Sequence, residues 1–190
     1  MKYPAEHYTR EEVDAILNAC PNNWVGFRNR ALIVVMWRSG LRLFEALALR
    51  PVDIDHEHQT IRVLHGKGDK ARTVGIDTGG LEYIDAWLKA RSEYITEDDF
   101  SLLFCTGRGR EINQSYVRRT MTKLGRKAHI AKRVHAHGFR HTFAVELARE
   151  GVSMINIQRL LGHASLATTS VYLASLSPEE ALDAVRVREW

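Results

Sequence analysis

One stretch of alternating residues interrupts a sequence that is otherwise patterned for helices. Residues 60–76 read TIRVLHGKGDKARTVGI, two β-type runs on either side of a Gly-Lys-Gly-Asp-Lys turn. A two-stranded hairpin is marginally stable by itself in water, so it must pack against the helices. The chain is therefore expected to adopt a mainly helical α+β fold in which a small antiparallel β-hairpin with a basic tip packs on a helical body.

Helical signals lie on both sides of this hairpin. Thr9 followed by Glu12 forms a capping box, and Val13, Ile16 and Leu17 then share one helical face. We predict helices over residues 9–20, 26–38, 42–49, 80–94, 114–127, 138–150 and 153–161, and a last short helix after residue 177. The segment LLFCTGRGR, residues 102–110, reads as a short strand followed by a glycine turn.

Length and composition indicate a globular protein with a real core. The 190 residues are 45% hydrophobic, but the longest apolar run, residues 31–37, is far shorter than the roughly 20 residues that cross a bilayer. We therefore predict no membrane association and a cytoplasmic location. Cys20 and Cys105 stand alone, in no CxxC arrangement, and are predicted to be reduced and buried.

The basic residues are concentrated in one segment. Residues 106–141 contain ten Lys or Arg and one acid, Glu111, whereas the rest of the chain holds 17 basic and 22 acidic residues. Such a segment suits a polyanion, because each neutralised phosphate releases a counterion, although a solvated basic face would read the same way. Nucleic acid is favoured as the partner over that alternative. The candidate nucleic-acid-binding residues here are Arg108, Arg118, Arg119, Lys123, Arg126, Lys127, Lys132 and Arg133.

Four motifs combine basic or imidazole groups with helix or hairpin positions. They are SGLRLFEAL (39–47), GKGDKAR (66–72), HAHGFRHT (135–142) and LGHASLATTSVYL (161–173). Each is weak alone, because surface arginines, Gly-Lys-Gly turns and structural histidines are common. Their joint order of Arg, Lys, His-x-x-Arg, His and Tyr is much more specific.

In order and spacing these motifs resemble the catalytic domain of the tyrosine recombinases, the phage-integrase family of DNA strand-exchange enzymes. The resemblance extends from about Thr9 to Leu173 and implies a mostly helical catalytic fold with a small sheet. It implies that double-stranded DNA is the partner and is cleaved and rejoined through a 3′-phosphotyrosyl intermediate, without a cofactor or metal. It also implies a bacterial or phage-encoded protein. It also assigns six catalytic residues: Arg42, Lys67, His137, Arg140, His163 and Tyr172.

The chemistry explains the two arginines and the tyrosine. A phosphodiester attacked by an alcohol accumulates charge on its non-bridging oxygens, which two guanidiniums can hold in bidentate geometry. Arg42 and Arg140 fit that role. A tyrosine hydroxyl has a pKa near 10, so Tyr172 needs a partner to take its proton or a cationic site that favours phenolate.

The remaining three residues serve proton transfer and charge stabilisation in a site of this family type. His137 is the expected base, and His163 would donate to a non-bridging oxygen. Lys67, at the hairpin tip, would protonate the departing 5′ oxygen as general acid. Lys70 competes with Lys67 for that role, but only Lys67 lies between two glycines, and Lys70 and Arg72 are instead expected to contact backbone phosphate.

Glu45 and His141 are expected to support the catalytic residues, and the spacing of two histidines raises the question of a metal site. Glu45, three residues after Arg42, either orients the guanidinium or forms an ordinary surface pair, and the sequence leaves both open. His141 is expected to brace the site. His137 and His141 are four residues apart, but Gly138 stands where a zinc hydrolase would need glutamate, so no metal site is predicted. His135 also competes with His137, but only His137 precedes Arg140 by three residues.

The domain organisation follows from where the match begins. We expect residues 1–190 to form a single catalytic domain without the N-terminal core-binding domain of larger members, as a fragment or as a naturally short recombinase. The expected assembly is a homotetramer on paired DNA sites and a monomer or weak oligomer when free. Relaxation of DNA in the manner of type IB topoisomerases and an inert DNA-binding module remain as alternatives.

Overall fold

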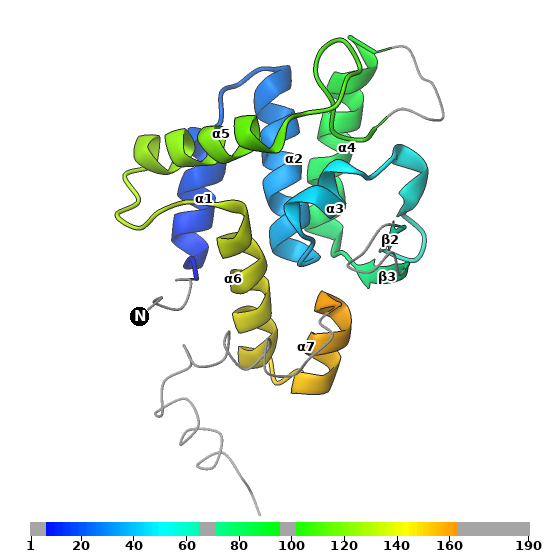
Figure 1. Cartoon of the computed structure of the whole chain (residues 1–190), viewed down its shortest axis with the longest axis vertical. Helices are drawn as coiled ribbons and strands as arrows, with labels where there is room; N and C mark the ends of the chain where they lie inside the picture. Colours follow the sequence, from blue (N-terminus) through cyan, green and yellow to red (C-terminus); the bar gives the residue numbers. More distant parts are fainter. Residues whose placement is uncertain (1–6, 65–70, 96–101, 163–190) are drawn as a thin grey trace, which may run out of the picture.

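Helix α2 (Trp24–Arg38) runs through the middle of the molecule, as Figure 1 shows for the computed structural model. The structure describes residues 7–64, 71–95 and 102–162. Helix α2 packs against α4 (Thr78–Ser92) and α6 (Ala136–Arg149), while α1 (Arg10–Ala19) packs against α5 (Gln114–Lys127). This mainly helical body with one small sheet confirms the predicted α+β fold class.

The capping box at the start of α1 is formed as predicted. The Thr9 hydroxyl accepts the backbone N–H of Glu12 at 3.2 Å, and the Glu12 carboxylate accepts the backbone N–H of Thr9 at 2.8 Å. The apolar face of the helix, with Val13, Ile16 and Leu17, is buried. Local sequence therefore determines both where this helix begins and which face it buries.

The predicted hairpin is confirmed, with one strand more than expected. Strands β2 (Thr60–Val63) and β3 (Arg72–Gly75) pair antiparallel, and their buried residues Ile61 and Val74 face each other. A two-residue strand, β1 (Ile54–Asp55), adds to the other edge of β2 after a short 3-10 helix (Pro51–Asp53). Two residues are too few to show alternation, so the sequence gives no signal for β1.

Most helix ends differ from the predicted ends by one or two residues. Helix α5 has the predicted range, whereas α2 begins two residues earlier because the Asn23 side chain accepts the N–H of Gly26. Helices α3 (Leu43–Leu47) and α7 (Met154–Leu161) are shorter than predicted. The predicted strand in 102–110 is wrong: Cys105 and Glu111 form only an isolated bridge. The last helix, predicted after residue 177, lies outside the described residues.

A glycine turn brings the α2–α3 junction against α6 and α7. Gly40 has φ of +64°, and a side chain there would collide with the ring of Phe143. Glycine is therefore required both by the backbone and by the close packing. Cys20 and Cys105 are buried, as predicted. Among the described helices, none is long and apolar enough to span a membrane.

Candidate active site

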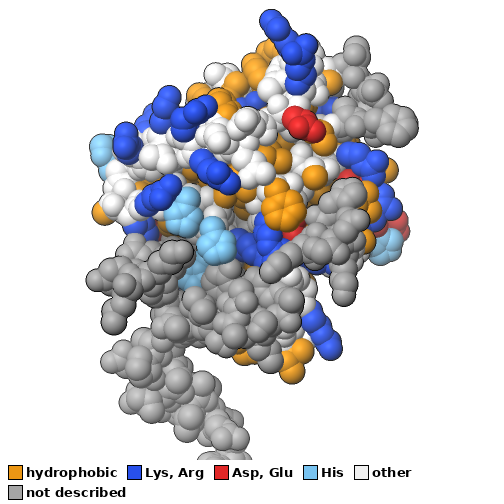
Figure 2. Space-filling view, viewed as in Figure 1, with side chains coloured by type: hydrophobic (Ala, Val, Ile, Leu, Met, Phe, Trp, Pro, Cys, Tyr) orange, Lys and Arg blue, Asp and Glu red, His pale blue; other side chains and the backbone are white. Residues whose placement is uncertain are grey.

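Three of the predicted catalytic residues meet at one cleft. The cleft has a volume of about 450 Å³ and lies between α3, α5 and the beginning of α6. Arg42, His137 and Arg140 all line it, although 95 residues or more separate the first from the other two. Figure 2 shows Lys and Arg side chains along α5, with histidines grouped beside them near the start of α6. The residues lining the cleft are Leu41, Arg42, Leu43, Phe44, Gln114, Arg118, Thr122, Arg133, His135, Ala136, His137 and Arg140.

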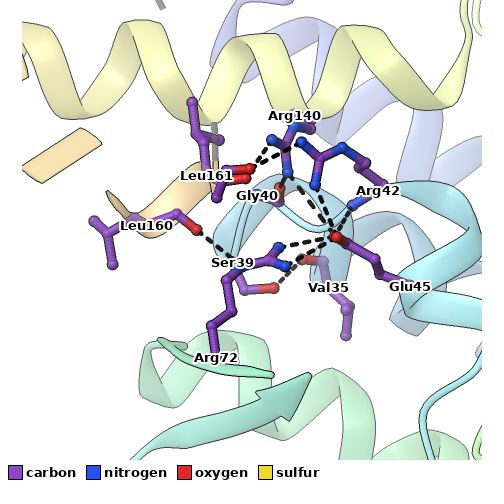
Figure 3. A network of polar contacts seen from close by, with 10 residues as sticks. Val35, Ser39, Gly40, Arg42, Glu45, Arg72, Arg140, Leu160 and Leu161 are labelled. Atoms are coloured by element: carbon purple, nitrogen blue, oxygen red, sulfur yellow. Dashed lines mark hydrogen bonds and ion pairs between the residues drawn. The ribbon is translucent and has the colours of Figure 1, made fainter. Parts of the chain in front are cut away.

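Glu45 is buried beside Arg42, a residue of the cleft, and holds two arginines, as Figure 3 shows. Its side chain is fully buried, and one carboxylate oxygen accepts from Arg42 Nη1 at 2.8 Å while the other accepts the Arg42 backbone N–H at 2.8 Å. Arg72 donates to both oxygens, at 2.9 and 2.8 Å. The interpretation as an ordinary surface pair is therefore wrong. Burial alone would raise the pKa of Glu45, but the hydrogen bonds and charge of Arg72 and Arg42 outweigh it and lower that pKa.

Backbone carbonyls orient Arg42 and Arg140, the two arginines that are expected to bind phosphate. Arg140, which is 1% exposed, donates to the carbonyl of Gly40 and, at 2.5 Å, to that of Leu161. Arg42 Nη2 donates to the carbonyl of Gly162 at 3.2 Å. Arg140 Nη1 is also 4.0 Å from the Glu45 carboxylate. Both guanidiniums are thus fixed on the same side of one buried carboxylate, and Figure 3 shows them side by side.

His137 is exposed on the cleft wall, in the first turn of α6. Partial burial, followed by the positive charges of Arg140, His135 and Arg42, lowers its pKa below the usual value. Its imidazole is therefore neutral near pH 7 and able to accept a proton. The ring of His135 lies parallel to it, 6.5 Å away.

His141 is 1% exposed and packs edge-on against His7, with the ring centroids 6.1 Å apart. Burial, with the charges of His7, His137 and His135 as further causes, lowers its pKa to about 4. A neutral, buried ring fits the predicted bracing role. Within the described part of the chain, no cluster of three or more His, Cys, Asp or Glu side chains could hold a metal ion.

The predicted DNA-binding residues divide into two groups. Arg118 and Arg133 line the cleft itself. The exposed members of the first group are Arg108, Arg118, Arg119, Lys123, Arg126 and Arg133. Lys127 and Lys132 form the second group, because their ammonium groups hold the N-terminal segment: Lys127 donates to the Ala19 carbonyl at 2.8 Å, and Lys132 donates to the His7 carbonyl at 2.7 Å. Lys127 is exposed and Lys132 is half-buried, and their predicted contacts with DNA stay predictions.

Arg72 is also engaged within the protein. Its side chain is 15% exposed and its guanidinium is occupied by Glu45. Arg72 is thus held by Glu45 in this structure, and its predicted contact with DNA stays a prediction. The predicted residues Lys67, Lys70, His163 and Tyr172 lie outside the described residues.

Comparison with known proteins decides the family. The phage integrase family model matches residues 6–178. The chain belongs to the phage integrase family. It is 35% identical over 151 residues to tyrosine recombinase XerC of Shewanella sp. (strain ANA-3), covering 80% of this chain and 50% of that protein. It is 33% identical over 162 residues to tyrosine recombinase XerC of Escherichia coli O157:H7 (strain EC4115 / EHEC), covering 85% and 53%. The chain thus spans about half the length of these curated relatives.

Solved structures of recombinases share the fold. XerA recombinase matches 97% of this chain and 66% of its own, with a TM-score of 0.82 and 30% identity. XerH site-specific recombinase bound to palindromic difH substrate, in a post-cleavage complex, matches 98% of this chain and 54% of its own, with a TM-score of 0.79 and 31% identity. The observed fold is therefore that of tyrosine recombinases.

The roles of His135 and Phe44, two residues that line the cleft, were not predicted from the sequence. The His135 side chain caps α6 by accepting the Gly138 N–H at 3.0 Å. Its position directly before an apolar helix was the available signal, since N-caps need a side-chain acceptor. Phe44 is 41% exposed at the cleft edge. No pattern distinguishes it from a core residue, because an aromatic in a short apolar helix usually reads as packing.

Proposed function

We propose that this chain is the catalytic part of a site-specific DNA recombinase that cleaves and rejoins strands through a 3′-phosphotyrosyl intermediate. The observation that carries the proposal is the convergence of Arg42 and Arg140 beside His137, above a buried carboxylate, in a cleft with a basic rim. Family membership and the four motifs add to it.

The arginines would bind the scissile phosphate. Guanidiniums donate pairs of parallel N–H groups, which match two non-bridging oxygens better than an ammonium does. Arg42 and Arg140 are already oriented by Glu45 and by backbone carbonyls, so little reorganisation is needed when charge builds up on phosphorus. Such preorganised donors stabilise the five-coordinate transition state more than the ground state.

Bond making and proton transfer would involve four further residues. The Tyr172 oxygen attacks phosphorus and forms the 3′-phosphotyrosyl bond while the bond to the 5′ oxygen breaks. His137 takes the phenol proton, and Lys67 supplies a proton to the departing 5′ oxygen. His163 donates to a non-bridging oxygen. Rejoining reverses these transfers, and because the new ester conserves the energy of the broken one, it requires no ATP.

The exposed basic face of α5 would hold the duplex. Its arginines and lysines neutralise phosphates and release counterions, a sequence-independent contribution to affinity. Exchange between two duplexes requires cleavage of four strands, and each copy carries one Tyr172, so we propose a homotetramer on paired sites. We expect a monomer or weak oligomer without DNA, acting in the bacterial cytoplasm.

The direct test is a covalent adduct. In a library of randomised duplexes nicked a few nucleotides to the 3′ side of the cleavage position, the short fragment that carries the new 5′-hydroxyl diffuses away. Rejoining is then impossible, and a cleaving enzyme is trapped as an SDS-resistant complex. Wild-type protein and the control Tyr83→Phe, altered at an exposed tyrosine of α4, should form the adduct, whereas Tyr172→Phe should not. An adduct that persists in Tyr172→Phe, or no adduct with wild-type protein, would contradict the proposal.

A further inference from the structure

Arg72 is engaged at both edges of its guanidinium. Its Nη1 and Nη2 donate to the two oxygens of Glu45, and its Nε donates to the carbonyl of Leu160 at 3.4 Å. The side chain starts on β3, the strand that follows the hairpin tip, and reaches α3 and the end of α7 (Figure 3). One residue therefore joins three elements that are far apart in sequence.

The end of α7 receives three arginines on three successive carbonyls. Arg72 binds Leu160, Arg140 binds Leu161, and Arg42 binds Gly162. The last carbonyls of a helix have no intrahelical partner and carry partial negative charge, so cations there are favourable. Arg72 therefore contributes to the same anchoring array as the two arginines that are proposed to bind phosphate.

Gly162 leaves room for this array. It ends α7 in the left-handed conformation, with φ of +62°, and a side chain there would approach the Arg72 guanidinium to 3.2 Å. Residue 162 is followed directly by His163 in the sequence and, nine residues after His163, by Tyr172. The contact with Arg72 therefore lies where the described chain leads into the segment that carries both.

We propose that Arg72 is a positioning residue for DNA cleavage. It fixes three parts of the molecule relative to one another: the hairpin whose sequence contains Lys67, the Arg42–Glu45 pair and the end of α7. The inference rests on the proposed function. Because Arg72 is 15% exposed and its donors face Glu45 and Leu160, its loss affects the rate of the chemical step and not the number of phosphates neutralised.

The test separates rate from affinity. Arg72→Lys and Arg72→Ala are compared with wild type and with the control Arg62→Ala, an arginine of the same sheet that is 54% exposed and pairs with Asp53. Duplexes selected by adduct formation with the wild-type protein are cleaved under single-turnover conditions at saturating protein, and their dissociation constants are measured over a series of salt concentrations. A thermal melt of each variant confirms folding.

We expect both Arg72 variants to cleave at least about tenfold more slowly than wild type, since lysine cannot copy the bidentate fork. The slope of log affinity against log salt should stay at the wild-type value, and ethylguanidinium in the buffer should partly restore the rate of Arg72→Ala. Loss of about 0.9 in that slope, the signature of one lost phosphate contact, would overturn the inference. So would an unchanged rate in folded Arg72→Lys. A wild-type protein that forms no adduct would instead overturn the proposed function and the inference together.

Discussion

Two buried carboxylates of this molecule are held by the same local arrangement. In both, the carboxylate accepts the backbone N–H of an arginine three residues earlier, at 2.8 and 2.9 Å, contacts that arginine's guanidinium and receives a second arginine from the sheet. The cleft triad consists of Arg42, Glu45 and Arg72, and the outer triad consists of Arg50, Asp53 and Arg62.

The two triads differ in what their guanidiniums face. Those of the outer triad are 30% and 54% exposed, whereas those of the cleft triad are 20% and 15% exposed and reach the carbonyls that end α7. A buried carboxylate three residues after an arginine is thus a structural arrangement that also occurs away from the cleft, so it does not by itself indicate a catalytic site. Its place beside Arg140 and His137 is what suits the cleft triad to phosphate chemistry.

Replacing the first arginine of each triad by lysine should give the largest difference in cleavage rate between the two triads. Arg42→Lys removes the planar fork proposed to hold the phosphate, and loss of one preorganised donor slows such reactions by about 100-fold or more. Arg50→Lys makes the same change in the outer triad and should leave the cleavage rate near wild type. Single-turnover cleavage measures both, and equal losses in the two variants would remove the functional distinction between the triads.

Neutralising each carboxylate should affect both stability and activity more strongly in the cleft triad. Glu45→Gln leaves two largely buried guanidiniums around a side chain without charge, and removing one partner of a buried pair costs about 3 kcal/mol. Asp53→Asn should cost less, because its two arginines are 30% and 54% exposed and stay hydrated. Urea unfolding should show the larger loss in Glu45→Gln, and slower cleavage should appear only in that variant. Wild-type stability in Glu45→Gln would show that its arginines do not depend on the carboxylate.

Acid should weaken the region around the cleft through His141. Its pKa is about 4 in the fold against 6.5 when unfolded, so the unfolded chain takes up the proton first. Stability from this group is complete above pH 6.5 and is lost as the pH falls toward 4, with a loss of about 2 kcal/mol at pH 5. The free energy of unfolding of His141→Gln should fall less between pH 7 and 5 than that of wild type. His58→Gln, at a 70% exposed histidine, is the control and should follow wild type.

Substitutions on the exposed basic face of α5 should have the smallest effect, and that effect should be on DNA affinity. Arg119→Ala is expected to weaken DNA binding several-fold and to reduce the slope of log affinity against log salt by about 0.9 per lost phosphate contact. Lys127→Ala, whose ammonium group holds the Ala19 carbonyl, should change that slope less. The reverse order would place the DNA on the α1 side of α5.

Sequence predicted the structure well where the signal is local. The capping box at Thr9, the range of α5 and the pairing of β2 with β3 depend on neighbouring residues or on one turn. Strand β1 and the bridge at Cys105 were not predicted, because each depends on a partner segment and is too short to show a pattern.

The assembly of the site was only partly predictable. The family motifs selected Arg42, His137 and Arg140, and these do line one cleft. The role of Arg72 could not be read from its neighbours, since its contacts with Glu45 and Leu160 join residues that are 27 and 88 positions apart. Its basic side chain beside a basic hairpin tip looked like a DNA contact, and only the packing reveals that it is turned inward.

In the proposed function, the arginines of the cleft stabilise the reacting phosphate and contribute little to DNA affinity. The most direct measurement is a single-turnover titration of Arg140→Lys with selected DNA, which yields the maximal cleavage rate and the half-saturating concentration together. We predict a maximal rate lower by about 100-fold or more with a half-saturating concentration close to wild type. A wild-type maximal rate with a raised half-saturating concentration, in protein that melts cooperatively, would contradict the account.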